Sequence, residues 1–121
     1  VCVTINAFAD ADSFDLCAVL SVVDTNGVAR NLTQGYLRTR GAGLHQIPLR
    51  GTCARIEPGE SLRLSLSGSC FPAYTLNDGS GRPDGEVRAT DHQIVTITVN
   101  TEGSMLMLPV QPEASQETGN E

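Results

Sequence analysis

Tryptophan and lysine are absent from the chain, and its aromatic residues are two Tyr and three Phe. A hydrophobic core built from this sequence must therefore be aliphatic. The eight basic residues are all Arg, they face 14 acidic residues, and the formal net charge is −6. Such a chain lacks the basic surface that nucleic acids and anionic membranes require. No apolar run approaches the ~18 residues of a membrane-spanning helix, and no secretory leader is visible.

What is present suits one folded domain, because the chain has 121 residues and 40% of them are hydrophobic. The first ten residues, VCVTINAFAD, read as a β-strand from the start, without an initiating Met. We expect the chain to be part of a longer protein, with further sequence upstream of Val1.

The four cysteines stand too far apart for a Cys-x-x-Cys metal or redox motif. They are Cys2, Cys17, Cys53 and Cys70. Two disulfides are one interpretation, and four small buried thiols in a reducing compartment are the other. We favour unpaired thiols, because a chain of this size with an aliphatic core does not need covalent crosslinks. Together with the absent leader, this favours the cytoplasm.

Alternation of apolar and polar residues dominates the pattern, and no segment shows a helical stripe. The segment 16–23 is apolar on both faces, so we expect a central strand that is covered twice. The Asn-Gly pair in DTNG predicts a tight hairpin in which both residues adopt positive φ. Strands are predicted at 1–7, 16–23, 28–38, 52–56, 61–67, 93–100 and 105–110, with turns at 24–27, 57–60 and 100–104 and loops at 41–51 and 76–89. The expected fold is an all-β antiparallel sandwich or jelly roll over residues 1–110, followed by a disordered acidic tail, 111–121.

Catalytic and metal motifs are hard to find. A serine hydrolase needs a nucleophile on a strained elbow with a His base, and no Gly-x-Ser-x-Gly occurs. We interpret His45 and His92 as surface or loop residues. The segment DADSFD offers Asp10, Asp12 and Asp15, but it lacks the glycine of a calcium loop, so we read it as a solvated turn. We predict no catalytic, cofactor or metal site in this chain.

A carbohydrate-binding module is the main alternative, since jelly-roll folds often carry such sites. Binding of sugars usually needs exposed aromatic rings, and the candidates here are Tyr36 and Tyr74. A stand-alone interaction domain is a further alternative.

The stretch CARIEPGESLRLSLSGSCFPAYTLNDGSG resembles the C-terminal domain of the cocaine-esterase / Xaa-Pro dipeptidyl-peptidase family of serine hydrolases. Members share a leucine-rich strand, an aromatic-proline corner and an Asn-x-Gly-x-Gly loop. The segments FADADSFDLCAVLSVVDTNGVARNLTQGYLRTR and QIVTITVNTEGSMLMLPV are similar to other strands of the same domain. Where the family has Gly-His, this chain has Gly59-Glu60. The matching positions in the first stretch are Gly59, Leu62, Arg63, Leu64, Ser69, Phe71, Pro72, Asn77, Gly79 and Gly81.

The resemblance implies a jelly roll like that of galactose-binding domains, lacking its first strand or strands. It also implies a parent serine hydrolase, an acyl esterase or dipeptidyl-peptidase, whose α/β-hydrolase domain holds the catalytic Ser, Asp and His. The present chain would pack against that catalytic domain and help to shape its substrate cleft. Isolated, it would expose an apolar patch and could self-associate.

The candidate domain-contact residues are Phe71, Pro72, Tyr74 and Asn77, at the corner and in the loop that follows it. Pro72 fixes φ and ends strand pairing, so the chain would turn sharply there and the loop would project toward a neighbouring domain. In the alternative interpretation, Phe71 closes one end of the core.

Overall fold

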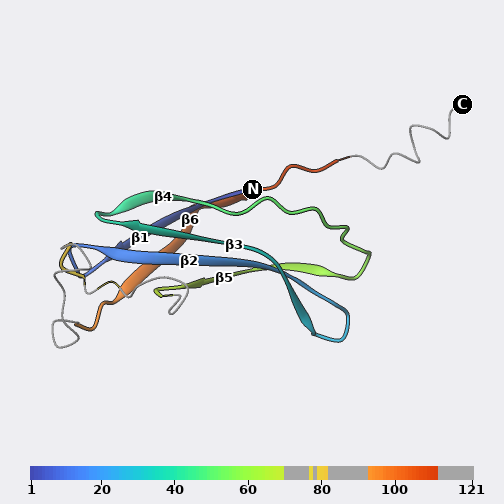
Figure 1. The fold of residues 1–121 in the computed structure, drawn as a ribbon, viewed down its shortest axis with the longest axis horizontal. Coiled ribbons are helices and arrows are strands. Elements are labelled where there is room, and N and C mark those ends of the chain that lie inside the picture. Colours follow the sequence, from blue (N-terminus) through green and yellow to red (C-terminus); the bar gives the residue numbers. More distant parts are fainter. Residues whose placement is uncertain (70–76, 78, 82–92, 112–121) are drawn as a thin grey trace, which may run out of the picture.

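The computed structural model describes residues 1–69, 77, 79–81 and 93–111, and this part of the chain is all-β, without a helix (Figure 1). Six strands form two antiparallel three-stranded sheets, ordered β4-β1-β6 and β3-β2-β5. They are β1 (Cys2–Ala9), β2 (Phe14–Val23), β3 (Ala29–Thr39), β4 (Gly43–Pro48), β5 (Ser61–Ser67) and β6 (Ile97–Met107). The predicted β-sandwich is therefore confirmed. The jelly-roll connectivity and the division into a domain and a tail stay predictions.

The core lies between the inner faces of the two sheets. Period-2 alternation places Val3, Ile5 and Ala7 of β1 on one inner face, and all three are at most 3% exposed. Leucines 64 and 66 of β5 pack against this core from the edge and are partly buried. The opposing inner face of β2 carries Phe14, Leu16, Ala18, Leu20 and Val22. Each large buried aliphatic side chain contributes about 1.5–3 kcal/mol, so an aliphatic core suffices without Trp.

Strand β2 is the central strand of its sheet, as its two apolar faces predicted. It pairs with β3 on one side and β5 on the other. Its outer face is also covered, because Asp15, Cys17 and Ser21 are all less than 5% exposed. A strand that is buried on both faces holds its register firmly, since a slip of one residue would exchange its two faces.

The hairpin between β2 and β3 forms at the predicted residues but with a different geometry. The Gly27 amide donates to the Asp24 carbonyl at 3.0 Å, and Asp24 Oδ1 accepts from the amides of Asn26 and Val28 at 2.9 Å each. Only Gly27 has positive φ, at 83°, so the expectation of positive φ at Asn26 was wrong. The aspartate side chain stabilises a turn in which one left-handed residue is enough.

Strand β4 occupies a segment that we expected to be a loop. It pairs with β1 at the edge of its sheet, which tolerates Pro48 at the strand end. Gly35 on β3 permits the close approach of this segment, since a Cβ there would lie 2.3 Å from the Pro48 carbonyl oxygen. The strand predicted at 52–56 is absent, and the whole segment is exposed. Alternation of apolar and polar residues alone does not form a strand, because a strand also needs a neighbouring strand with which to pair.

Strand β6 joins two segments that we predicted as separate strands. Thr4 pairs with Met105 and Asn6 with Asn100, so the expected turn is instead a bulge within one strand. The Asn6 amide donates to Ser104 Oγ at 3.0 Å, and Ser104 Oγ donates to the Asn100 carbonyl. Gly103, with φ at 81°, supplies the left-handed residue of this bulge. Both halves therefore continue along β1, instead of folding back as a hairpin.

Among the described residues, no helix is long and apolar enough to cross a membrane.

Candidate functional site

A buried carboxylate organises the outer face of the β3-β2-β5 sheet. The side chain of Asp15 is 1% exposed and accepts four hydrogen bonds. Oδ1 accepts from Arg38 Nε at 3.0 Å and from Asn77 Nδ2 at 2.9 Å, while Oδ2 accepts from the Tyr36 hydroxyl at 2.9 Å and Arg38 Nη2 at 3.3 Å. We call Ser13, Asp15, Tyr36, Arg38 and Asn77 the Asp15 cluster. Because its charge is paired and its oxygens are occupied, Asp15 is not a general base or a nucleophile here.

Strand pairing explains how the cluster assembles. Asp15 lies directly opposite Arg38, and Cys17 lies opposite Tyr36, so the Arg and Tyr side chains flank the carboxylate on one face. The sequence interpretation of Asp15 as a residue of a solvated turn was wrong. The turn ends at Ser13, and Asp15 already belongs to β2. In the sequence, Asp15 and Arg38 lie on opposite sides of the predicted hairpin turn at similar distances from it. This spacing could have predicted that the two residues are paired.

Asn77 connects the loop in which it lies to the β3-β2-β5 sheet by side-chain hydrogen bonds. Its amide Nδ2 also donates to Ser13 Oγ at 2.8 Å, and its Oδ1 accepts from the Gly79 amide at 2.9 Å. The Ser13 amide in turn donates to the Gly79 carbonyl at 3.1 Å. Of the four candidate contact residues, Asn77 is therefore an internal anchor, and its contact with another domain stays a prediction. Phe71, Pro72 and Tyr74 lie outside the described residues.

The Asp15 cluster changes the pKa of the Tyr36 hydroxyl. Burial, helped by the hydrogen bond to Asp15 and the negative charge of that carboxylate, raises the pKa of Tyr36 to about 12, against the opposing effect of Arg38. Tyr36 is thus held as a neutral hydrogen-bond donor. It is half-buried and bonded through its hydroxyl, so it does not offer the exposed ring that a sugar platform needs.

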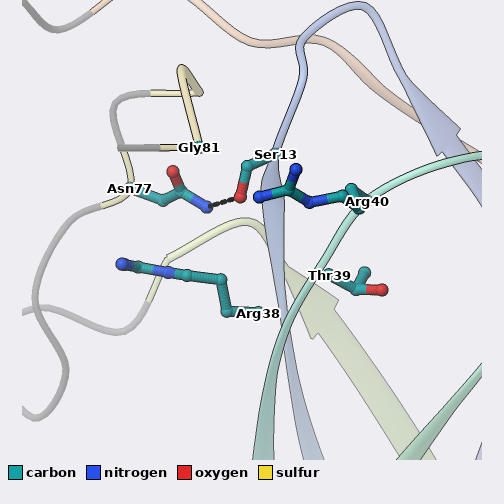
Figure 2. Close-up of a pocket in the computed structure, with 6 residues that line it drawn as sticks. All are labelled: Ser13, Arg38, Thr39, Arg40, Asn77 and Gly81. Atoms are coloured by element: carbon teal, nitrogen blue, oxygen red, sulfur yellow. Dashed lines mark hydrogen bonds between the residues drawn. The ribbon is translucent and has the colours of Figure 1, made fainter. Parts of the chain in front are cut away.

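Two cavities flank Asn77. The smaller, about 110 Å³, is lined by Ser13, Arg38, Thr39, Arg40, Asn77 and Gly81 (Figure 2). The larger, about 300 Å³, lies at the end of the sandwich. Its described lining residues are Ser13, Phe14, Asp15, Gly68, Ser69, Asn77, Gln93, Val95 and Ile97.

His45 is buried, contrary to its interpretation as a surface or loop residue. Its Nε2 lies 3.0 Å from the Gly41 carbonyl and 3.2 Å from the Ala7 carbonyl, and its Nδ1 lies 3.1 Å from Thr39 Oγ1. Since carbonyls only accept, Nε2 carries a proton, and Nδ1 lies within hydrogen-bond distance of the threonine hydroxyl. Phe14 packs edge-on against the ring at 5.3 Å. This histidine is a satisfied core residue, and His92 lies outside the described residues.

The aspartates of DADSFD do not converge on a common point. Asp10 Oδ1 accepts from the Thr96 amide at 2.8 Å, Asp12 is exposed, and Asp15 faces the cluster. Within the described ranges, no three His, Cys, Asp or Glu side chains are placed to hold a metal ion.

The cysteines only partly match the expectation of four buried thiols. Cys2 and Cys53 are free, in agreement with it. However, Cys17 is buried, Cys2 is half-buried and Cys53 is exposed. The segment that carries Cys53 forms no strand, so nothing brings this thiol into the core. Cys70 is not among the described residues.

The outer face of the other sheet exposes several large apolar side chains. The sequence led us to expect an exposed apolar patch, but not its place in the fold. Phe8, Leu44, Met105 and Met107 point outward and are 45–63% exposed, beside the exposed Pro48. Strand pairing connects them, since Met107 and Pro48 both lie opposite Cys2, and Leu44 lies opposite Asn6. We call Phe8, Leu44, Pro48, Met105 and Met107 the apolar face. Uncharged polar residues, among them Thr4 and Gln46, lie between them. Large exposed apolar side chains that gather on one face mark interaction surfaces more often than scattered ones do.

A comparison with known families gives one match. The model of a family described as the X-Pro dipeptidyl-peptidase C-terminal non-catalytic domain matches residues 1–105. The match extends from before β1 to Met105 within β6, and it confirms the resemblance seen in the sequence. No curated protein and no solved structure matches the chain significantly.

Proposed function

This chain belongs to the family of X-Pro dipeptidyl-peptidase C-terminal non-catalytic domains, and from this premise we propose that it packs against the α/β-hydrolase catalytic domain of its parent protein. In this role it helps to shape the substrate cleft of an acyl esterase or Xaa-Pro dipeptidyl-peptidase. The catalytic Ser, Asp and His belong to the partner domain, and the contribution of this chain is a rigid surface.

The apolar face is the structural observation that carries this proposal. The outward positions of β1 and β4 and the outward residues of β6 beyond its bulge include no charged side chain, although 18% of the chain is charged. Inter-domain interfaces commonly bury roughly 600–1,500 Å², and a face of a three-stranded sheet is of suitable size. Burial against a second domain would remove four large apolar side chains from water.

The parent protein provides the test. We expect sequence encoded upstream of Val1 to contain a Gly-x-Ser-x-Gly elbow followed by Asp and His. In that protein, a Leu44→Lys, Met105→Lys double variant should weaken the contact, because two ammonium groups would be buried without partners. Calorimetry should then show the two domains unfolding separately, where the unsubstituted protein unfolds with coupled transitions.

The matched control places the same charge on the opposite sheet. Ser65 is exposed on β5, so Ser65→Lys should leave the coupling unchanged. Equal effects of the two substitutions would overturn the assignment of the apolar face. The chain alone should not hydrolyse p-nitrophenyl esters or Xaa-Pro anilides, and turnover blocked by a serine-reactive inhibitor would contradict the non-catalytic role.

A further inference from the structure

A positively charged cavity lies beside the Asp15 cluster, and we propose that it binds an oxyanion, either a carboxylate or a phosphate group. The proposal goes beyond packing against a catalytic domain and rests on the residues that line the smaller cavity. These residues come from the β1–β2 turn, the end of β3 and the segment that Asn77 anchors (Figure 2).

Arg40 supplies the charge. It follows the last residue of β3, is exposed, and has no hydrogen-bond or ion-pair partner among the described residues. Arg38, by contrast, is neutralised by Asp15 through two of its nitrogens. Among the described lining residues, Arg40 is therefore a guanidinium without an acidic partner, in a chain whose net charge is −6. A planar guanidinium suits the two oxygens of a carboxylate or phosphate group.

Gly81 leaves room for the guanidinium of Arg40 beside the cavity. A Cβ on Gly81 would lie 3.0 Å from Arg40 Nη2, and the φ of 80° further disfavours any side chain there. Figure 2 shows Arg40 extending toward Ser13 and Gly81. Its guanidinium thus belongs to the lining of the cavity.

Ser13 adds a hydrogen-bond donor. It is 3% exposed, and its hydroxyl oxygen accepts from Asn77 Nδ2, while no described group accepts from the hydroxyl itself. Because a hydroxyl can accept and donate at the same time, its proton is available to a ligand. About 110 Å³ is many times the ~10–15 Å³ that one water needs, so the cavity can hold a carboxylate or phosphate group.

The test is a titration of the complete chain, followed by amide chemical shifts. Inorganic phosphate and a blocked aspartate are the two probes, each against sodium chloride at equal ionic strength, because salt screens exposed charges. We expect the amides of Ser13 and Gly81 to shift, with a dissociation constant on the order of 1–10 mM for a bidentate guanidinium contact together with the Ser13 hydroxyl.

Variants identify the charge responsible. Arg40→Gln should weaken binding about tenfold or more, and Arg40→Lys should weaken it less, because the ammonium keeps the charge but loses the planar fork. Arg63→Gln is the matched control, since Arg63 is an exposed arginine on β5 outside the cavity, and binding should not change.

The two probes distinguish the sources of the oxyanion. Tighter binding of phosphate supports a free ion as the ligand, and tighter binding of the aspartate supports a side-chain carboxylate from a packed protein surface. An absence of shifts with both probes, or equal binding by Arg40→Gln and the unsubstituted chain, would overturn the site.

Discussion

The two outer faces of the sandwich carry opposite kinds of side chain. On the β3-β2-β5 sheet, a buried carboxylate is surrounded by Arg, Tyr and Asn donors that come from β3 and from the anchored loop. On the β4-β1-β6 sheet, large apolar side chains stand exposed among uncharged polar residues, and the charged residue of β6, Glu102, lies in its bulge. The first face satisfies its polar groups internally, whereas the second leaves apolar area in water.

The two outer faces are therefore expected to have different roles, one in the stability of the fold and the other in contacts with other proteins. Removing a partner from a satisfied polar cluster leaves buried charges and donors without bonds, so the Asp15 cluster should matter for folding. Changing an exposed apolar residue alters little in the isolated chain, so the apolar face should matter for association. Four experiments test this difference between the two outer faces.

The largest effect is expected from Asp15→Ala. The substitution removes the carboxylate that accepts hydrogen bonds from Arg38, Tyr36 and Asn77. The free energy of unfolding should fall by about 2–4 kcal/mol, less than for a fully buried pair, because the remaining Arg38 side chain is 30% exposed. Urea denaturation measures the change, with Ser65→Ala on the same sheet as the control. A loss below about 1 kcal/mol would mean that the cluster is not what holds this face together.

Asn77→Ala should have an intermediate effect. It removes the donor to Ser13 and Asp15 and the acceptor of the Gly79 amide, at a cost of about 1–3 kcal/mol. The loss should be local, so amide hydrogen exchange should increase at Ser13 and Gly79 and stay unchanged in β1. Uniformly faster exchange throughout the sandwich would argue against a local anchor.

A pH titration tests the state of Tyr36. The folded chain raises its pKa from 10.0 to about 12, so folding favours the neutral phenol. This contribution to stability is fully present below about pH 10 and is lost as the pH rises from about 10 to about 12. In a Tyr74→Phe background, phenolate absorbance reports Tyr36 alone. Asp15→Asn should move the midpoint down toward 10.0, and an unchanged midpoint would show that the carboxylate has no part in the shift.

The smallest stability change is expected on the apolar face. Met105→Lys replaces a side chain that is 55% exposed, so the free energy of unfolding should change by less than about 0.5 kcal/mol. We expect the isolated chain to self-associate through this face, and sedimentation should show the substitution restoring the monomer. Ser65→Lys serves as the control for added charge. Association that survives Met105→Lys would place the contact elsewhere.

Much of the fold could be predicted because it depends on local alternation. Strands β1, β2 and β5 appear in the sequence as period-2 patterns whose apolar sets are the ones that point inward. Strand β4 was missed because its short pattern is bounded by glycines and ends in proline. The bulge in β6 was read as a turn, since Gly103 suits either, and only pairing with β1 distinguishes them.

The candidate sites were less accessible from the sequence. Asn77 was identified through the family resemblance, but its partners Ser13 and Asp15 lie 64 and 62 residues away. Likewise, the apolar face combines residues from three strands, each of which contributes one or two exposed side chains. Neither arrangement leaves a periodic signal within a single segment.

By itself, the sequence determined that the chain is all-β, that its core is mainly aliphatic and that it belongs to a family of non-catalytic domains. Composition and alternation carry this information because they act over a few residues at a time. Tertiary structure alone decided that Asp15 is buried and paired, that His45 is in the core, and that one sheet presents an apolar outer face. These outcomes depend on which strands become neighbours, and strand pairing joins residues that are far apart along the chain.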